Sequence, residues 1–183
     1  MTTTRPSGAR PRVVIAEDEA IIRLDLKELL QEEGYDVVGE TGRGDEAIEL
    51  VRDLRPDLVI LDIKMPGLDG LSAARHVASE RLAAVLMVTA FSQRDLVEQA
   101  RDAGALAYLV KPFQKSDLIP AIEVALGRFA ELSALERDVE ARDARRHADA
   151  QARQADSLRA TVRELEQEQD SLLDRISAEL SAR

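Results

Sequence analysis

The sequence of 183 residues contains no cysteine and no tryptophan. Without cysteine the chain can form no disulfide, no thiol nucleophile and no cysteine-bound zinc site, so those kinds of site are excluded. No apolar run reaches the length of a membrane span, and residues 1–11 lack the apolar centre of a signal peptide. We therefore expect a cytoplasmic protein without membrane contact, in which residues 1–11 form a disordered lead.

Basic residues are also in deficit, since 25 Lys and Arg face 35 Asp and Glu and the formal net charge is −10. This charge argues against a protein whose main role is to bind nucleic-acid phosphates, although a local basic patch could still do so. The hydrophobic fraction of 45% is sufficient for one globular core with residues left over.

Short apolar runs alternate with helical patterns along the first two thirds of the chain. A run that is apolar at consecutive positions predicts a strand buried on both faces, as in the interior of a parallel sheet. The predicted strands cover residues 12–16, 35–39, 58–61, 83–89 and 105–110, and a helix follows each. Ser116 and Asp117 are expected to cap the last of these helices, with Pro120 in its first turn. Parallel neighbours need right-handed crossovers, so residues 12–127 are predicted to form a flavodoxin-like (βα)5 doubly wound α/β domain.

Chemically active side chains follow four of the predicted strands. Glu17 and Asp18 come after the first strand, Asp62 after the third, Thr89 ends the fourth and Lys111 follows the fifth. The carboxyl ends of parallel strands meet at one edge of the sheet, where ligands bind in open α/β folds. Carboxylates that lie close together repel one another, and Mg²⁺ bound by their oxygens offsets that repulsion while leaving positions for a phosphate oxygen. The pattern favours a magnesium-dependent phosphate site.

These residues resemble the receiver domain of two-component response regulators over roughly residues 12–127. The matching motifs are Glu17-Asp18, the segment 61–67 around Asp62, Thr89-Ala90, Tyr108 and Lys111-Pro112-Phe113. The resemblance implies that Asp62 is the phosphoacceptor for a partner sensor histidine kinase. It also implies a Mg²⁺ site formed by Glu17, Asp18, Asp62 and the backbone carbonyl of Lys64. Thr89 and Lys111 would bind the phosphoryl oxygens. Tyr108 would be the switch aromatic, and the Lys111-Pro112 peptide bond would be cis.

The implied roles have a physical logic. A carboxylate approaches phosphorus only when the negative charges are neutralised, which a metal ion and the Lys111 ammonium can do. The acyl phosphate adds negative charge, and Thr89 can donate a hydrogen bond to it. The inward movement of Thr89 leaves room for Tyr108 to turn toward the core. The face formed by the fourth helix, fifth strand and fifth helix would then report phosphorylation. In the alternative interpretation Tyr108 is an ordinary edge-strand aromatic.

A phosphatase of the haloacid dehalogenase type is the enzymatic alternative, because such enzymes also use an aspartate after an apolar strand. Such enzymes carry an Asp-x-Asp motif, in which the second aspartate is the general acid. Here residue 64 is lysine, so no general acid lies two residues beyond Asp62. His147 lies in a charged segment without the flanking pattern of a phosphoacceptor histidine. The sequence therefore predicts a regulatory protein and not an enzyme.

Residues 128–183 contain no glycine, proline or lysine, which is typical of a long helix. Leu132, Leu135 and Val139 begin an apolar seam, and a second seam with alternating spacings of three and four, out of phase with the first, comprises Ala155, Leu158, Val162, Leu165, Gln169, Leu172 and Ile176. The pattern predicts a dimeric coiled-coil arm roughly 80 Å long at 1.5 Å per residue. The alternative is an intramolecular hairpin that bends in the alanine-rich middle.

The segments 90–96 and 129–136 are similar to those of ANTAR-type regulators, which bind nascent RNA and prevent transcription termination. That resemblance implies a C-terminal RNA-binding bundle. Nothing after Phe129 is aromatic, and acidic residues outnumber arginines there, so base stacking and phosphate neutralisation lack their usual residues. We therefore expect a helical homodimerisation or partner-binding arm and keep RNA-binding antitermination as the alternative.

Overall fold

The computed structural model describes the backbone of residues 9–181 and their side chains except those of residues 175, 176 and 179–181. Of the lead expected over residues 1–11, residues 1–8 lie outside this described part. The chain divides into two units, Met1–Leu132 and Ser133–Arg183.

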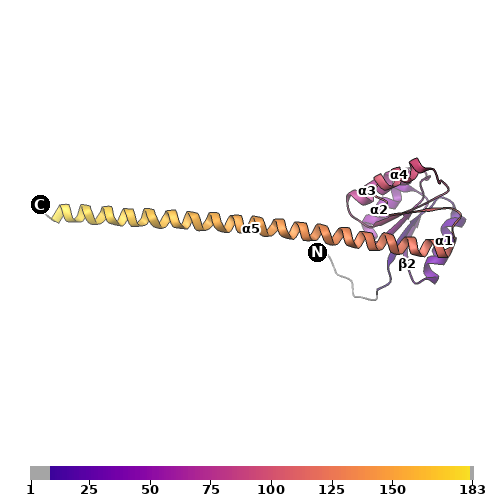
Figure 1. The fold of residues 1–183 in the computed structure, drawn as a ribbon, viewed down its shortest axis with the longest axis horizontal. Helices are drawn as coiled ribbons and strands as arrows, with labels where there is room; N and C mark the ends of the chain where they lie inside the picture. Colours follow the sequence, from indigo (N-terminus) through magenta and orange to yellow (C-terminus); the bar gives the residue numbers. More distant parts are fainter. Residues whose placement is uncertain (1–8, 182–183) are drawn as a thin grey trace. The chain divides into compact units, whose positions relative to one another are not determined.

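Strands and helices alternate strictly along the first unit (Figure 1). The strands are β1 (Arg12–Ala16), β2 (Asp36–Thr41), β3 (Leu58–Leu61), β4 (Ala84–Thr89) and β5 (Ala107–Val110). The helices are α1 (Ala20–Glu32), α2 (Gly44–Leu54), α3 (Gly70–Ser79), α4 (Arg94–Asp102) and α5 (Lys115–Ser181), which continues into the second unit. The predicted β–α units are confirmed, with differences confined to element ends.

The five strands pair in parallel in the order β2-β1-β3-β4-β5. Every residue of β3 and β4 is buried, which explains why their sequences are apolar throughout except for Thr89 at the end of β4. Because β2 lies on one side of β1 and β3 on the other, the order reverses between β1 and β3. The flavodoxin-like doubly wound sheet is therefore confirmed, and its switch point lies beside the residues that follow β1 and β3.

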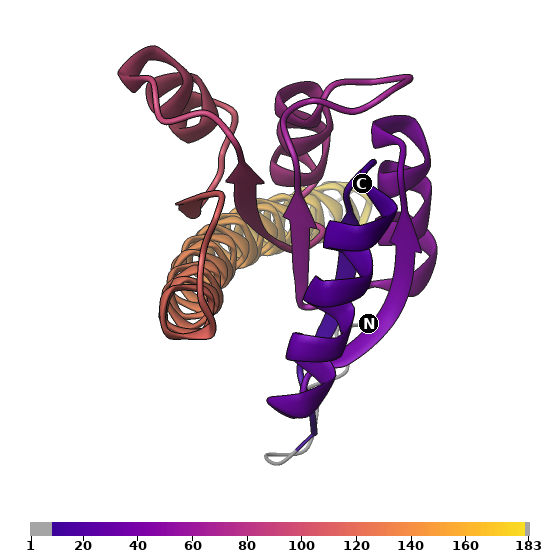
Figure 2. The same cartoon turned by 90° about the vertical axis from the view of Figure 1, so that its right-hand side faces the viewer.

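Two helical layers cover the sheet (Figure 2). On one face, Leu26 and Leu30 of α1 and Leu118 and Ile122 of α5 are buried against the strands. On the other face, α2, α3 and α4 bury small and aliphatic side chains in a separate cluster. Full burial of one such leucine or isoleucine contributes about 1.5–3 kcal/mol, so both layers stabilise the sheet that positions the site.

The first turn of α5 differs from the sequence prediction. The helix begins at Lys115, and the Asp117 carboxylate accepts a hydrogen bond from the backbone N–H of Gln114 at 2.9 Å. A side chain inside the first turn that bonds back to the preceding N–H forms half of a capping box. Ser116 is therefore inside the helix instead of capping it, and Pro120 lies in the second turn.

Side-chain contacts fasten the start of α5 to the segment between α1 and β2. The Tyr35 hydroxyl donates to the Glu123 carboxylate at 2.7 Å, and Lys115 forms an ion pair with Glu33. Tyr35 is buried, and burial together with the adjacent Glu123 raises the pKa of its phenol. The phenol therefore remains a hydrogen-bond donor at neutral pH.

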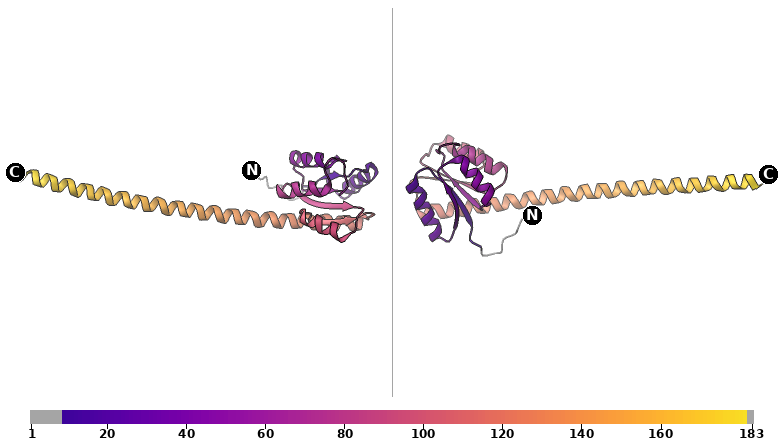
Figure 3. Two further views of the ribbon diagram at one scale, coloured as in Figure 1. Left: turned by 90° about the horizontal axis from the view of Figure 1, so that it is seen from above. Right: turned by 180° about the vertical axis from the view of Figure 1, so that it is seen from behind.

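The second unit contains the later part of α5, which is one unbroken helix through Ser181 (Figure 3). The hairpin alternative is therefore wrong for the described residues. Large apolar side chains lie exposed along this helix, among them Leu135, Val139, Leu158, Val162, Leu165 and Leu172. The side chain of Ile176, the last residue of the expected seam, is outside the described part. Although α5 is long, neither it nor another described helix is apolar enough over the length needed to cross a membrane.

Candidate functional site

Backbone hydrogen bonds hold the predicted site residues together at the carboxyl edge of the sheet. The Asp62 N–H donates to the Ala16 carbonyl at 2.9 Å, which continues the β1–β3 ladder beyond its last pair. The Lys111 N–H donates to the Thr89 carbonyl at 2.8 Å and extends the β4–β5 ladder in the same way. The structure thus brings the ends of β1, β3, β4 and β5 together.

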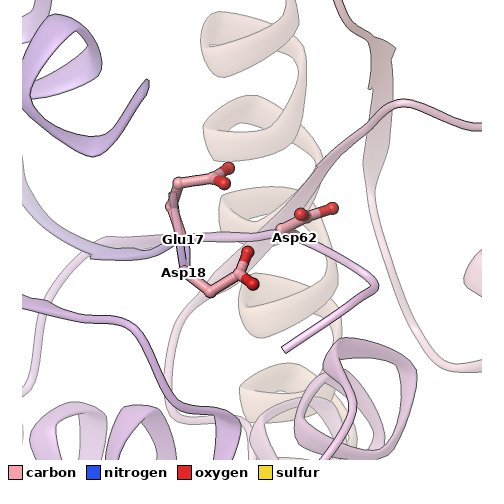
Figure 4. Close-up of side chains that lie close together, drawn as sticks. All are labelled: Glu17, Asp18 and Asp62. Atoms are coloured by element: carbon pink, nitrogen blue, oxygen red, sulfur yellow. The ribbon is translucent and has the colours of Figure 1, made fainter. Parts of the chain in front are cut away.

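Three carboxylates converge at the switch point (Figure 4). Glu17, Asp18 and Asp62 each offer an oxygen, and these oxygens all lie within 4.8 Å of one another. Glu17 and Asp62 are only 1% and 6% exposed, whereas Asp18 faces solvent. Two buried carboxylates and one accessible carboxylate form an oxygen-rich cluster that could hold a hard divalent cation.

Lys111 forms ion pairs with two carboxylates of this cluster. Its Nζ lies 2.5 Å from Glu17 Oε2 and 3.2 Å from Asp62 Oδ2. Burial raises the pKa of the Glu17 carboxyl, although the hydrogen bond from Lys111 opposes that shift. Burial alone would lower the pKa of Lys111, but the bond to Glu17 and the charge of Asp62 outweigh it and raise the pKa. The site therefore keeps a positive charge directly beside Asp62.

Thr89 presents a buried hydroxyl at the end of β4. The residue is fully buried, and its Oγ1 finds no hydrogen-bond partner within the described part of the chain. A buried hydroxyl without a partner costs free energy, which a ligand oxygen could recover by accepting a hydrogen bond from it. The unpaired hydroxyl is consistent with a site for an oxygen-rich ligand.

Phe91 connects the loops that follow β3 and β4, and the sequence did not reveal this role. Its backbone carbonyl accepts a hydrogen bond from the Tyr108 hydroxyl at 2.6 Å. Its ring faces the Lys64 ammonium, whose Nζ lies 4.4 Å from the ring centroid. Burial, and secondarily the charge of Asp62, raise the pKa of Tyr108, so the hydroxyl remains protonated. The residues two positions after Asp62 and Thr89 are therefore in contact.

Gly70 allows the start of α3 to approach Asp62 closely. A Cβ atom at Gly70 would lie 1.8 Å from the Asp62 carbonyl oxygen, a distance that no side chain tolerates. The Gly70 N–H donates to the Ile63 carbonyl at 2.9 Å, and the Asp69 carboxylate caps α3 by accepting from the Ser72 N–H. These contacts fix the backbone from which Asp62 and Lys64 project.

Arg23 is a second site neighbour that the sequence did not single out. Its guanidinium donates to the backbone carbonyl of Glu17 and holds the turn between β1 and α1. The only available signal was its position in the first turns of α1, which does not distinguish it from an ordinary solvated arginine. Geometry was needed to identify this contact.

A parallel sheet in this order, with an acidic cluster, a buried hydroxyl and a lysine at its switch point, is the arrangement of a receiver domain. The response regulator receiver domain family matches residues 13–123. The chain belongs to this family, and it is a response regulator.

Two curated relatives illustrate the sequence similarity. The transcriptional regulatory protein PdtaR of Mycobacterium tuberculosis is 62% identical over 138 residues, which cover 75% of this chain and 67% of PdtaR. The chemotaxis protein CheY of Thermotoga maritima is 38% identical over 112 residues, or 61% of this chain and 93% of CheY. The match to PdtaR is longer than residues 13–123, so similarity extends outside the receiver family match.

Solved structures give the same result. The signal receiver domain of a modulated diguanylate cyclase from Desulfovibrio desulfuricans is 31% identical with a TM-score of 0.62, covering 66% of this chain and 97% of that chain. A chain of the CheX-CheY-BeF3-Mg²⁺ complex from Borrelia burgdorferi is 25% identical with a TM-score of 0.61, and the match covers 63% of this chain and 88% of that chain. The recognition of a receiver fold is confirmed.

Proposed function

We propose that Asp62 accepts a phosphoryl group from a sensor histidine kinase. An Asp62 carboxylate oxygen forms the new O–P bond while the P–N bond to the kinase histidine breaks and the imidazole leaves. The observation that carries the proposal is the contact of Lys111 Nζ with Asp62 at 3.2 Å, inside a cluster of three carboxylates. The ammonium lowers the repulsion between carboxylate and phosphoryl oxygens as they approach.

The carboxylate cluster fits Mg²⁺ by its donor chemistry. Glu17, Asp18 and Asp62 would supply carboxylate oxygens, and Lys64 would supply its backbone carbonyl. The ion would supply positive charge that neutralises the carboxylates and the incoming phosphoryl oxygens. The Mg²⁺ in the CheX-CheY-BeF3-Mg²⁺ complex from Borrelia burgdorferi supports this choice of metal by similarity.

The phosphoryl group would bring Thr89 and Tyr108 into a switch. Thr89 Oγ1 has no partner among the described residues, so it is available to donate to a phosphoryl oxygen. Tyr108 is half-buried, and its hydroxyl is hydrogen-bonded to the carbonyl of Phe91, which lies in the loop that follows Thr89. Movement of Thr89 toward Asp62 would shift that loop and change the surface formed by α4, β5 and α5.

The exposed apolar seam of α5 supports an output through chain pairing. Leu158 and Leu165 are 61% and 59% exposed, and a second helix that covered them would remove apolar surface from water. We therefore propose that the receiver controls a homodimerisation or partner-binding arm formed by residues 128–183.

Binding of RNA is a second candidate function. PdtaR is a transcriptional regulatory protein, and its similarity to this chain extends outside residues 13–123. ANTAR-type antitermination would account for such a relationship. The proposal remains secondary because no aromatic residue follows Phe129 in the sequence. Any binding through Arg142, Arg145, Arg146 and Arg153 is expected to be weak and lost at modest salt.

The test of phosphorylation compares wild type with Asp62→Asn. Both proteins are incubated with acetyl phosphate and Mg²⁺, and the acid-labile gain of mass is measured. We expect the gain in wild type, its loss in Asp62→Asn and its loss when Mg²⁺ is chelated. Asp53→Asn is the matched control, because Asp53 is an exposed aspartate on α2 and should still permit the gain. Equal labelling of Asp62→Asn and wild type would refute the assignment.

A further inference from the structure

The second seam of α5 extends further toward the N-terminus than its leucines indicate. Positions spaced alternately by three and four continue without interruption across this part of the helix: Ala141, Ala144, Ala148, Gln151, Ala155, Leu158, Val162, Leu165, Gln169 and Leu172. Ala155 is half-exposed and the other nine are exposed. The break in phase with the first seam therefore falls between Val139 and Ala141, and a single stripe spans the alanine-rich middle.

The two halves of this stripe differ in side-chain size. The half from Ala141 to Ala155 has alanine at four of five positions, and the half from Leu158 to Leu172 has leucine or valine at four of five. Each half has one glutamine, Gln151 or Gln169. Facing positions of two helices pack well when large side chains lie opposite small ones, so the halves are complementary in volume.

From this complementarity we propose that two copies of the arm pair antiparallel, so that Ala148, Gln151 and Ala155 of one chain face the leucine half of the other. The proposal rests on the homodimer proposed above and adds its polarity and register. One alignment places the glutamines in a common layer and large residues against smaller ones: Ala148 with Leu172, Gln151 with Gln169, Ala155 with Leu165, and Leu158 with Val162. Paired amides can satisfy each other's donors and acceptors, which neither amide could do against leucine.

A parallel pair in register would place each residue opposite its own copy. Alanine would then face alanine through half of the stripe, which buries little apolar surface, while the large residues would all lie in the other half. The antiparallel arrangement distributes large side chains along the whole contact. Volume therefore favours the antiparallel pair.

Charge favours the same polarity. Residues 164–174 contain five acidic residues and no basic residue, so a parallel pair would place this segment against its own copy. The antiparallel alignment places it opposite residues 146–156, where Arg146 and Arg153 balance Asp149 and Asp156 in formal charge. Like charges held side by side along paired helices are destabilising, whereas mixed charges are not.

Spin labels in the full-length protein can measure this polarity. The chain has no cysteine, so a single introduced cysteine carries the label. Ala160→Cys and Ala178→Cys lie on exposed faces outside the stripe. In the proposed register residue 160 faces its own copy, and two labels there should be roughly 20 Å apart, about the width of two helices. Labels at 178 are displaced by 36 residues along the axis, or about 54 Å.

The results separate polarity from pairing. A short distance at 160 together with a long distance at 178, in a protein of dimeric mass, is the expected result. Short distances at both positions would establish a parallel dimer, overturning the antiparallel proposal while leaving the homodimer intact. Long distances at both positions would overturn the register. Absence of dipolar coupling with a monomeric mass would overturn the homodimer and the polarity together.

Discussion

The hydroxyl of Tyr108 on β5 donates a hydrogen bond to the backbone carbonyl of Phe91 at 2.6 Å. This bond spans the loop after β4 and joins the aromatic residue of the proposed switch to the segment that follows Thr89. Tyr108 is therefore bonded to a backbone carbonyl two residues after Thr89, whose hydroxyl is proposed to bind the phosphoryl group. A displacement of that loop would therefore break or move the hydrogen bond of Tyr108.

Tyr108→Phe should remove this bond and keep the ring packing. We expect a loss of about 1 kcal/mol in unfolding free energy and faster amide hydrogen exchange in residues 90–93. Tyr35→Phe is the matched control, since it also removes a partly buried hydroxyl bond, to Glu123, but far from that loop along the chain. Exchange in residues 90–93 that is as slow in Tyr108→Phe as in wild type would contradict the role of this bond.

Gly70→Ala should disrupt the site through its backbone. The added Cβ would meet the Asp62 carbonyl oxygen at 1.8 Å, so we expect a loss of about 1–3 kcal/mol of stability and reduced labelling by acetyl phosphate. Gly127→Ala is the control, because nothing lies within 4 Å of its added Cβ, and it should stabilise α5 by about 0.5–1 kcal/mol. Unchanged labelling of a folded Gly70→Ala protein would show that the close approach is dispensable.

Asp69 should give α3 a pH-dependent cap. Burial opposes ionisation of its carboxyl, but hydrogen bonds from the Ser72 N–H and hydroxyl outweigh this and lower the pKa. Since the folded pKa lies below the unfolded pKa, the carboxylate stabilises the fold above the unfolded pKa and loses this effect as pH falls through the folded pKa. Asp69→Ala should cost about 1 kcal/mol at neutral pH and less in acid, as measured by urea unfolding.

Asp69→Asn provides the control for this titration. The amide oxygen can still accept from the Ser72 N–H but cannot be protonated in the same range. The difference in stability between Asp69→Asn and Asp69→Ala should therefore stay constant with pH. A constant difference between wild type and Asp69→Ala across the acid range would contradict the cap's titration.

The pair Leu158→Asp and Leu165→Asp should separate the chains. Burying two unpaired carboxylates between helices should cost several kcal/mol of association free energy. Light scattering should show a dimer for wild type and a monomer for this double variant. Ala160→Asp with Gln167→Asp is the matched control, because it adds the same charges at the same spacing on another face of the helix. A wild-type monomer at micromolar concentration would reject pairing through the arm.

The core of the fold was predictable because burial leaves a strong trace in the sequence. β3 reads Leu-Val-Ile-Leu, a pattern typical of a strand covered on both faces. The parallel sheet follows from five short strand patterns separated by helices. The proximity of Glu17, Asp62 and Lys111 was predictable for the same reason, since the carboxyl ends of parallel strands share one edge.

Other contacts were not predictable, because they depend on loop geometry and not on residue spacing. Phe91 interacts through a backbone carbonyl and a ring face, and neither leaves a pattern in the sequence. The start of α5 was misjudged because Ser116 and Asp117 are both good capping residues. The structure shows that Asp117 acts from inside the helix, reaching back to Gln114.

The lack of tryptophan leaves two phenols, Tyr35 and Tyr108, as the dominant near-ultraviolet chromophores of the protein. Tyr35 is bonded to Glu123 at the start of α5, and Tyr108 is bonded to the loop that follows Thr89, beside the proposed phosphorylation site. Each tyrosine is thus a separate optical reporter, one beside the proposed phosphorylation site and one at the start of α5. Replacing either tyrosine by phenylalanine would isolate the signal of the other, without attaching an external dye.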